Sequence, residues 1–323
     1  MRKIELTTFG IVFVTLLAAI PTNANNVKSV KEAAEIAEKE LLLKEGIVGI
    51  SYTDNKPYKV IVYIESEEYR SIVPDEIAGF KTEIRVSGRI KAIGLVEPKS
   101  IVIPQMLGWK RRIHWDPTVG GISVGTNYIT AGTLGVCIGG FILSCAHVIA
   151  YDMNANPLQI GTSVIQPGLS DGGGPVIGYL YDYIPIRFGL LSLIFPNHAD
   201  AAIANLCHSA KTNAVLGPDD TNTYSISMTA KVPWVGQTVR KSGRTTAVTY
   251  NTVKDRHAAI KVWYDSKWAR FKDVIVVEEP FIEPGDSGSF VDLNGNFVGL
   301  VFAGSPYYAY VCKASYIKSA FGI

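Results

Sequence analysis

The chain has 323 residues, 47% of them hydrophobic and 19% charged. This length suits roughly two domains with real cores, and the composition excludes a highly charged disordered chain. The 31 basic and 29 acidic residues leave a net charge of +2, too small to draw the chain onto a nucleic-acid backbone, so nucleic acid is a poor first guess for a partner. Four cysteines without a CxxC pair indicate neither a disulfide scaffold nor a zinc or dithiol site. We expect no metal and no cofactor.

The first 24 residues are typical of a secretory signal peptide. A basic start is followed by an apolar run from Phe9 to Ile20, which Pro21 ends, and small residues then precede position 25. A spanning helix needs about 20 apolar residues, so this run is short for an anchor. We therefore expect cleavage after residue 24, a secreted or extracytoplasmic protein and no stable membrane span. The alternative is a chain tethered to the membrane by an uncleaved signal.

Residues 25–95 predict a small α+β domain. The segment 27–44 alternates apolar and charged residues at helical spacing. Strand-like runs at Ile47–Tyr52 and Tyr58–Ile64 flank a turn-rich stretch that favours a hairpin, and Lys81–Val86 predicts a further strand. No cluster of histidine, cysteine or paired carboxylates marks a site here. An inhibitory propiece is one hypothesis for this domain, and a binding unit is another.

Residues 96–118 predict a linker with scattered prolines. Its three adjacent cations at 110–112 are more typical of a solvated loop than of a ligand site. From Gly120 onward, short β-branched runs alternate with glycine and asparagine, and the sequence predicts a helix only at Ala314–Phe321. Strands at such short spacing are the pattern of sandwiches and barrels.

Three short segments carry candidate chemistry. Ser287 lies in a glycine-flanked turn, GDSGS, where the N–H groups of Gly285 and Ser287 could converge on an oxyanion. A serine needs a base, and His147 ends an apolar strand in the segment SCAHV. The imidazole in turn needs a carboxylate, and Asp200 begins the apolar run DAAIA. A buried carboxylate in such a context requires a partner.

The order of these three segments, and their contexts, resemble the trypsin and chymotrypsin-like serine peptidases. The resemblance covers the chain from about residue 119 to its end. The segments GGISVG, ITAGTLG, KSGRTTAVT and VGLVFAGS further resemble a prokaryotic, largely archaeal branch whose members often carry an extra N-terminal region. The resemblance implies a mainly β fold of two antiparallel barrels, preceded here by the small α+β domain.

By this resemblance the peptidase domain spans 119–323, with barrels at about 119–210 and 230–323. It implies a serine endopeptidase acting on polypeptide substrates, with His147, Asp200 and Ser287 as the catalytic triad and the N–H groups of Gly285 and Ser287 as the oxyanion hole. The alternative from another class is a binding or scaffold protein that kept the barrels and lost turnover.

The resemblance also points to the substrate pocket. Phe281 stands where trypsin has its pocket-floor aspartate, and the opposite wall would come from Phe302, Ala303 and Gly304. These residues suggest an apolar or aromatic side chain as substrate. No activation sequence of the digestive enzymes precedes the first barrel, so we expect Asp286, beside the nucleophile, to find an internal partner.

Overall fold

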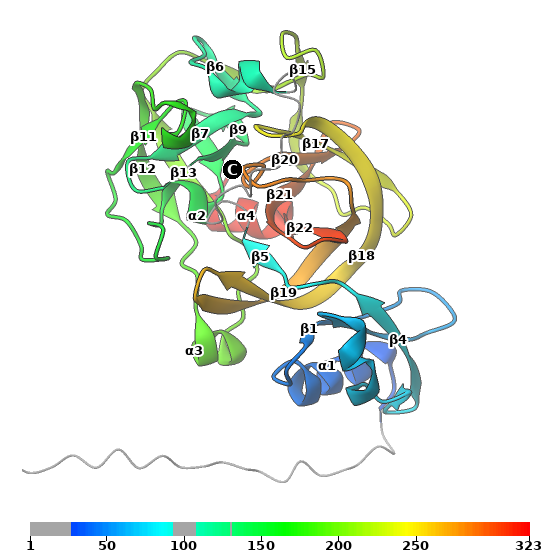
Figure 1. The fold of residues 1–323 in the computed structure, drawn as a ribbon. Helices are drawn as coiled ribbons and strands as arrows, with labels where there is room; N and C mark the ends of the chain where they lie inside the picture. The colour runs from blue at the N-terminus through cyan, green and yellow to red at the C-terminus, as the bar shows by residue number, and fades with distance from the viewer. Residues whose placement is uncertain (1–26, 93–107, 130) are drawn as a thin grey trace, which may run out of the picture.

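The computed structural model describes residues 27–92, 108–129 and 131–323 (Figure 1). The signal peptide predicted at 1–24 and the first part of the predicted linker lie outside the described residues. Strands dominate the rest, and the α-helices of the described chain are α1 (Val30–Leu41), α2 (Ala146–Ile149), α3 (Gly189–Ile194) and α4 (Ala314–Phe321). Within the described ranges, none of these helices has the length and apolarity to cross a bilayer.

The first barrel is a sheet whose two ends are consecutive in sequence. Its strand order is β8-β7-β11-β12-β13-β10-β9, and only Gly135 separates β8 from β9. Because these terminal strands form one extended segment, the sheet curls back on itself and closes. The strands are β7 (Ile122–Thr126), β8 (Gly132–Leu134), β9 (Val136–Ile138), β10 (Phe141–Ser144), β11 (Ser163–Ile165), β12 (Val176–Tyr183) and β13 (Ala202–Leu206).

The second barrel closes through direct strand pairing. Its order is β17-β20-β21-β22-β19-β18, and β17 pairs with β18 to complete the ring. At the β20–β21 turn Asn294 and Gly295 have φ angles of 54° and 80°, the left-handed values that an Asn-Gly hairpin needs. The strands are β17 (Thr238–Gly243), β18 (Ala247–Tyr264), β19 (Lys267–Glu278), β20 (Phe290–Leu293), β21 (Asn296–Gly304) and β22 (Tyr308–Lys313). The two closed barrels confirm the predicted mainly β double-barrel fold.

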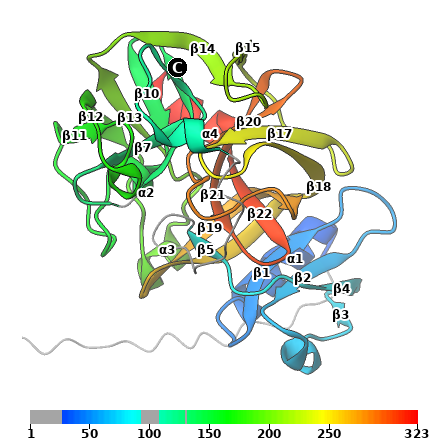
Figure 2. The same ribbon diagram turned by 45° about the horizontal axis from the view of Figure 1, so that its top comes forward.

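The N-terminal unit, residues 27–92, is joined edge to edge to the second barrel. Its helix α1 covers a sheet of β1 (Ile47–Tyr52), β2 (Val60–Ile64), β4 (Phe80–Val86) and β3 (Glu76–Ile77). Strand β1 pairs antiparallel with the far end of β18, so the unit's sheet continues that of the barrel. Figures 1 and 2 show the long, curved β18 reaching from the barrel to this unit.

Short strands complete the described chain. β6 (Thr118–Gly120), β14 (Ala210–Leu216) and β15 (Thr223–Ser225) form a separate three-stranded sheet, and β16 (Ser227–Ala230) pairs with β21. The strand β5 (Lys91–Ala92) leaves the N-terminal unit and pairs with both β18 and β21.

The basic cluster at 110–112 contains a buried residue. Arg111 is fully buried, and its guanidinium donates to the carbonyl oxygens of Gly121 (3.0 Å) and Gly217 (2.6 Å) and to Ser242 Oγ (2.6 Å). Asp220 pairs with its Nε at 2.5 Å. The expectation of a solvated loop is therefore wrong for Arg111, because the fold supplies enough acceptors to offset the desolvation of its charge.

Candidate active site

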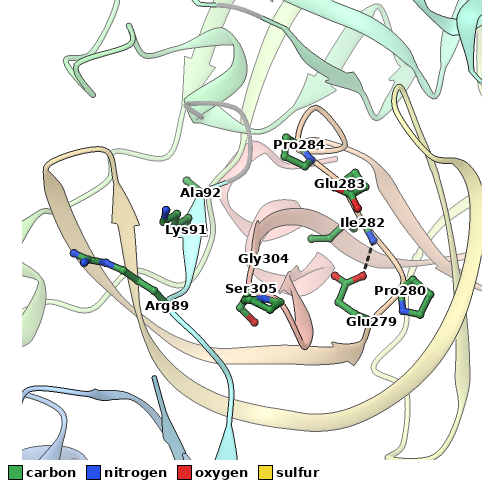
Figure 3. A pocket seen from close by; sticks show the side chains of 11 residues that line it. Arg89, Lys91, Ala92, Glu279, Pro280, Ile282, Glu283, Pro284, Gly304 and Ser305 are labelled. Carbon is green, nitrogen blue, oxygen red and sulfur yellow. Dashed lines mark hydrogen bonds between the residues drawn. The ribbon is translucent and has the colours of Figure 1, made fainter. Parts of the chain in front are cut away.

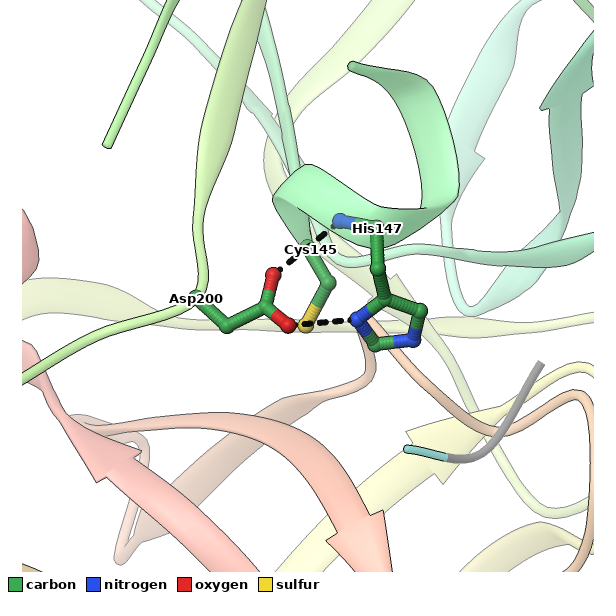
Figure 4. Close-up of side chains that lie close together, drawn as sticks. All are labelled: Cys145, His147 and Asp200. Carbon is green, nitrogen blue, oxygen red and sulfur yellow. Dashed lines mark hydrogen bonds and ion pairs between the residues drawn. The ribbon is translucent and has the colours of Figure 1, made fainter. Parts of the chain in front are cut away.

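His147 and Asp200 meet at one end of the first barrel. His147 lies in α2 directly after β10, and Asp200 lies just before β13. These strands pair antiparallel with Ser144 opposite Ala202, which brings the end of one beside the start of the other. His147 Nδ1 lies 2.6 Å from Asp200 Oδ2, and the backbone N–H of His147 donates to Oδ1 at 3.1 Å (Figure 4).

A third donor holds the Asp200 carboxylate. Tyr264, at the end of β18, donates its hydroxyl to Asp200 Oδ2 at 2.8 Å. Burial, reinforced by the negative charge of Asp200, raises the pKa of Tyr264 well above its ordinary value, so the phenol remains a donor. With Asp200 accepting at Nδ1, the imidazole can keep Nε2 as its proton acceptor. Sequence reasoning missed Tyr264, because no local pattern marks a residue that contacts Asp200 from the other barrel.

The turn at 285–289 has a geometry that requires glycine at its start. Gly285 has a φ of 101°, and a Cβ there would lie 2.2 Å from Arg244 Nη1 and 2.5 Å from Thr245 Oγ1. Thr133, in β8 of the first barrel, donates its Oγ1 to Gly285 O at 2.9 Å and its N–H to Ser287 O at 2.7 Å. The first barrel therefore fixes the position of the turn that carries Ser287.

The same turn packs against the segment that leads to His147. A Cβ on Gly288 would lie 2.4 Å from Ser144 Oγ and 3.3 Å from Cys145 N. The fold thus brings the three predicted residues to the junction of the barrels, from positions far apart in sequence. Ser287 is fully buried and His147 is only 1% exposed.

Two buried side-chain atoms at this junction have no hydrogen-bond partner among the described residues. His147 Nε2 and Ser287 Oγ are both buried and unpaired, so they are not bonded to each other in this arrangement. Within the same residues, the N–H groups of Gly285 and Ser287 donate to no acceptor. Buried polar groups without partners are rare, and they concentrate where a ligand or reaction uses them.

Asp286 has the internal partner that the sequence analysis expected. Its Oδ2 lies 3.2 Å from Lys241 Nζ, and both side chains are fully buried. Thr246 Oγ1 donates to Oδ2 at 2.6 Å and Thr245 N to Oδ1 at 2.9 Å. Although burial opposes ionisation, Lys241 and these hydrogen bonds lower the pKa of the Asp286 carboxyl. The turn is therefore held by a lysine within the chain.

A cavity of about 490 Å³ opens beside this turn (Figure 3). Its lining is Arg89, Lys91, Ala92, Glu279, Pro280, Ile282, Glu283, Pro284, Gly304, Ser305 and Pro306. Of the four predicted pocket residues, Gly304 lines it. Phe281 and Phe302 instead pack in the hydrophobic core, 1% and 0% exposed, and Ala303 pairs with Ala92.

Glu279 gives this cavity an acidic wall. Its Oε2 accepts the N–H groups of Phe281 and Ile282, while its Oε1 is buried without a partner among the described residues. Burial raises the pKa of Glu279 to about 7. The sequence had suggested an apolar pocket, whereas the wall that the structure presents contains two carboxyl groups, those of Glu279 and Glu283.

Cys145 lies close to the His147–Asp200 pair, and their ligand atoms lie within 4.8 Å of one another. Burial raises the pKa of the Cys145 thiol well above its ordinary value, and the S–H donates to Val301 O at 3.2 Å. The thiolate that a metal would need is thus disfavoured here. All four cysteines are free thiols; Cys207 is exposed and the others are buried.

Comparison with known proteins gives structural likeness at low sequence identity. No family model matches the chain, and no curated protein matches it. Among solved structures, the Nocardiopsis protease NAPase is 16% identical, with a TM-score of 0.44, over 63% of this chain and 96% of its own. Thermobifida fusca protease A (16%, TM-score 0.45) and Cellulomonas bogoriensis chymotrypsin (17%, TM-score 0.45) each match 63% of this chain and 95% of their own. The two closed barrels of this chain agree with the double β-barrel that its sequence motifs predict.

Proposed function

We propose that the chain is a serine endopeptidase that hydrolyses peptide bonds through an acyl-enzyme intermediate. The observation that carries the proposal is a buried imidazole that Asp200 orients at 2.6 Å. Among the described residues its Nε2 is unpaired, as is the hydroxyl of Ser287 at the same junction. A base and a nucleophile in this relation are what acyl transfer needs. Catalytic hydrogen bonds are often formed only when substrate binds.

The reaction would proceed in two transfers. Ser287 Oγ attacks the carbonyl carbon while its proton passes to His147 Nε2, and the N–H groups of Gly285 and Ser287 donate to the oxyanion. The C–N bond then breaks, and the imidazolium gives its proton to the leaving amine. Water, deprotonated by the same imidazole, hydrolyses the resulting ester and regenerates the serine. Asp200 stabilises the imidazolium in both steps.

Labelling with a fluorophosphonate probe tests this proposal. We expect the probe to modify Ser287, identified by peptide mass, and Ser287→Ala to abolish the modification. A Ser289→Ala variant, two residues away in the same turn, is the matched control and should still be labelled. Peptide binding without labelling or cleavage would instead favour the scaffold protein.

We also propose that the protein acts outside the cytoplasm, on the pattern of its first 24 residues. Expression of the full chain with a C-terminal tag, followed by N-terminal sequencing of the exported product, tests this. A new N-terminus near residue 25 is expected. An intact N-terminus on membrane-bound protein would favour the tethered alternative, and intact cytoplasmic protein would overturn both.

A further inference from the structure

Strand β5 belongs to the N-terminal unit by sequence but lies within the second barrel. Ala92 pairs with Ala303 and Lys91 with Gly304, antiparallel to β21, while Lys91 also pairs with Trp263 of β18. Ile90 O accepts the N–H of Trp263 at 3.0 Å. Ile90 and Ala92 are 0% and 1% exposed, so these two residues of the segment are buried. Figure 3 shows Lys91 and Ala92 on this strand.

The edge that β5 occupies continues directly from the nucleophile turn. On one side β21 pairs with β22 throughout its second half. On the other side it pairs with β20 and then with the turn, where Gly288 N donates to Val301 O at 2.9 Å and Val301 N to Ser289 O at 3.1 Å. Beyond Val301 the partner on this side is β5. The strand therefore fills the stretch of edge next to Ser287.

The direction of β5 matters for chemistry at Ser287. Because the pairing is antiparallel, the chain passes Gly304 at Lys91 and then Ala303 at Ala92, so it runs towards Val301 and the nucleophile turn. An extended peptide that adds to an exposed sheet edge gains main-chain hydrogen bonds, and side-chain pockets then select it. A polypeptide substrate delivered to Ser287 along β21 would need this same edge and would adjoin the same cavity.

The rest of the N-terminal unit holds β5 in place. Beyond the β1–β18 pairing, Asp255 of β18 is buried and accepts Ser51 Oγ and Tyr63 Oη, each at 2.8 Å. Glu38 of α1 accepts Arg270 Nε at 2.6 Å and lies 3.1 Å from Lys272 Nζ. These contacts cross from the unit to the barrel, so β5 is a tethered ligand of high effective concentration.

We propose that residues 27–92 are an intramolecular inhibitor whose strand β5 occupies the peptide-binding edge of the active site. The proposal rests on the proposed peptidase function. It assigns a role to a unit in which the sequence marks no catalytic cluster, and it gives the pairing of β5 with Ala303 and Gly304 a function. Activation requires β5 to leave β21.

The test compares the rate of fluorophosphonate labelling at Ser287 in the intact full chain and in Ala92→Arg. A charge at this buried position cannot keep the strand seated. We expect labelling and hydrolysis of a tetrapeptide ester to rise about tenfold or more, since a tethered ligand competes at roughly millimolar effective concentration. Lys44→Gln, which changes an exposed residue of the same unit outside β5 and the cavity, is the matched control and should leave both rates unchanged.

The outcomes separate the two proposals. Equal labelling of the parent and Ala92→Arg would overturn the inhibitor and leave the peptidase standing. Absence of labelling in every variant would overturn the peptidase and the inhibitor with it. Should Ala92→Arg fail to fold, Glu38→Gln decides: it loosens the unit far from Ser287, so a several-fold faster labelling supports the proposal and an unchanged rate overturns it.

Discussion

Asp200, in the first barrel, and Asp286, in the second, are both fully buried, but the groups that hydrogen-bond to their carboxylates differ in charge. Asp200 is held by an imidazole, a phenol and a backbone N–H, none of which carries a permanent charge. Asp286 faces the ammonium group of Lys241, with threonine hydroxyl and backbone donors around it. The neutral donors around Asp200 do not compensate its negative charge, so the carboxylate can stabilise a proton gained by His147. Lys241 neutralises the Asp286 carboxylate permanently.

Under the proposed function, Asp200 serves the reaction, whereas the lysine pairing of Asp286 indicates a role in the fold. Removing charge from Asp200 leaves neutral neighbours, so the loss falls on the orientation and the cationic form of His147. Removing charge from Asp286 leaves Lys241 buried without its partner, so the loss falls on stability. Replacing aspartate by asparagine should therefore mainly lower activity at Asp200 and mainly lower stability at Asp286.

Asp200→Asn should give the largest effect on activity. An amide cannot stabilise the imidazolium and favours the wrong tautomer, so we expect kcat/KM to fall by about 10⁴ relative to the otherwise identical chain. Its urea unfolding midpoint should move less than that of the Asp286 variant. Activity within tenfold of the parent, together with a loss of stability as large as that of Asp286→Asn, would contradict a separate role for Asp200.

Asp286→Asn should give the largest effect on stability. An unpaired buried lysine costs about 3–5 kcal/mol, measurable as a lower free energy of unfolding in urea. Because the pKa of Asp286 is lowered in the fold, its contribution is present above the ordinary carboxyl pKa of about 4 and is lost as pH falls through the lowered value. Asp292→Asn is the control: its partner Arg240 is 24% exposed, so its loss should be smaller.

Glu279 is a third carboxyl on the same segment, and within the described residues its hydrogen-bond partners include neither a cation nor a hydroxyl. Burial raises its pKa to about 7 from an unfolded value of about 4.3. The folded chain therefore holds this proton more tightly, and stability declines as pH rises from about 4.3 to 7. Glu279→Gln should remove that decline, by at most about 3 kcal/mol at pH 8 relative to pH 4.

Thermal or urea unfolding at pH 4, 6 and 8 measures this difference. Glu278→Gln is the matched control, because its side chain is 44% exposed and pairs with Lys254 at the surface. A parallel pH dependence in the parent and Glu279→Gln would contradict a raised pKa for the Glu279 carboxyl.

The elements that the sequence could predict are those determined by interactions between residues close together in the chain. The Asn294-Gly295 hairpin follows from two residues that tolerate positive φ, and α1 and the strands of the N-terminal unit follow from apolar periodicity. The segments around His147, Asp200 and Ser287 could be identified as candidate site segments, because each combines a polar residue with a strand end or a glycine turn.

The parts that were missed depend on contacts between distant segments. Arg111 is buried because acceptors from residues 10 to 132 positions away surround it, and no window of sequence reveals them. Phe281 packs in the core and not in the predicted pocket, because contacts with distant segments also decide its position. The position of β5 on β21 depends on pairing between residues more than two hundred positions apart, since Ala92 pairs with Ala303.

Tyr264→Phe should give the smallest of these effects, because it removes only one neutral donor from the Asp200 carboxylate. The substitution keeps the ring and removes one hydrogen bond to the carboxylate, worth roughly 1.5 kcal/mol, so kcat/KM should fall about tenfold with KM little changed. Tyr151→Phe is the control, because that buried hydroxyl accepts Ile186 N at 2.8 Å and has no bond to Asp200. If Tyr264 only filled space, both variants would keep parental kcat. If it positions Asp200, only Tyr264→Phe lowers kcat, and Tyr264 then belongs with the groups that orient the imidazole from the opposite barrel.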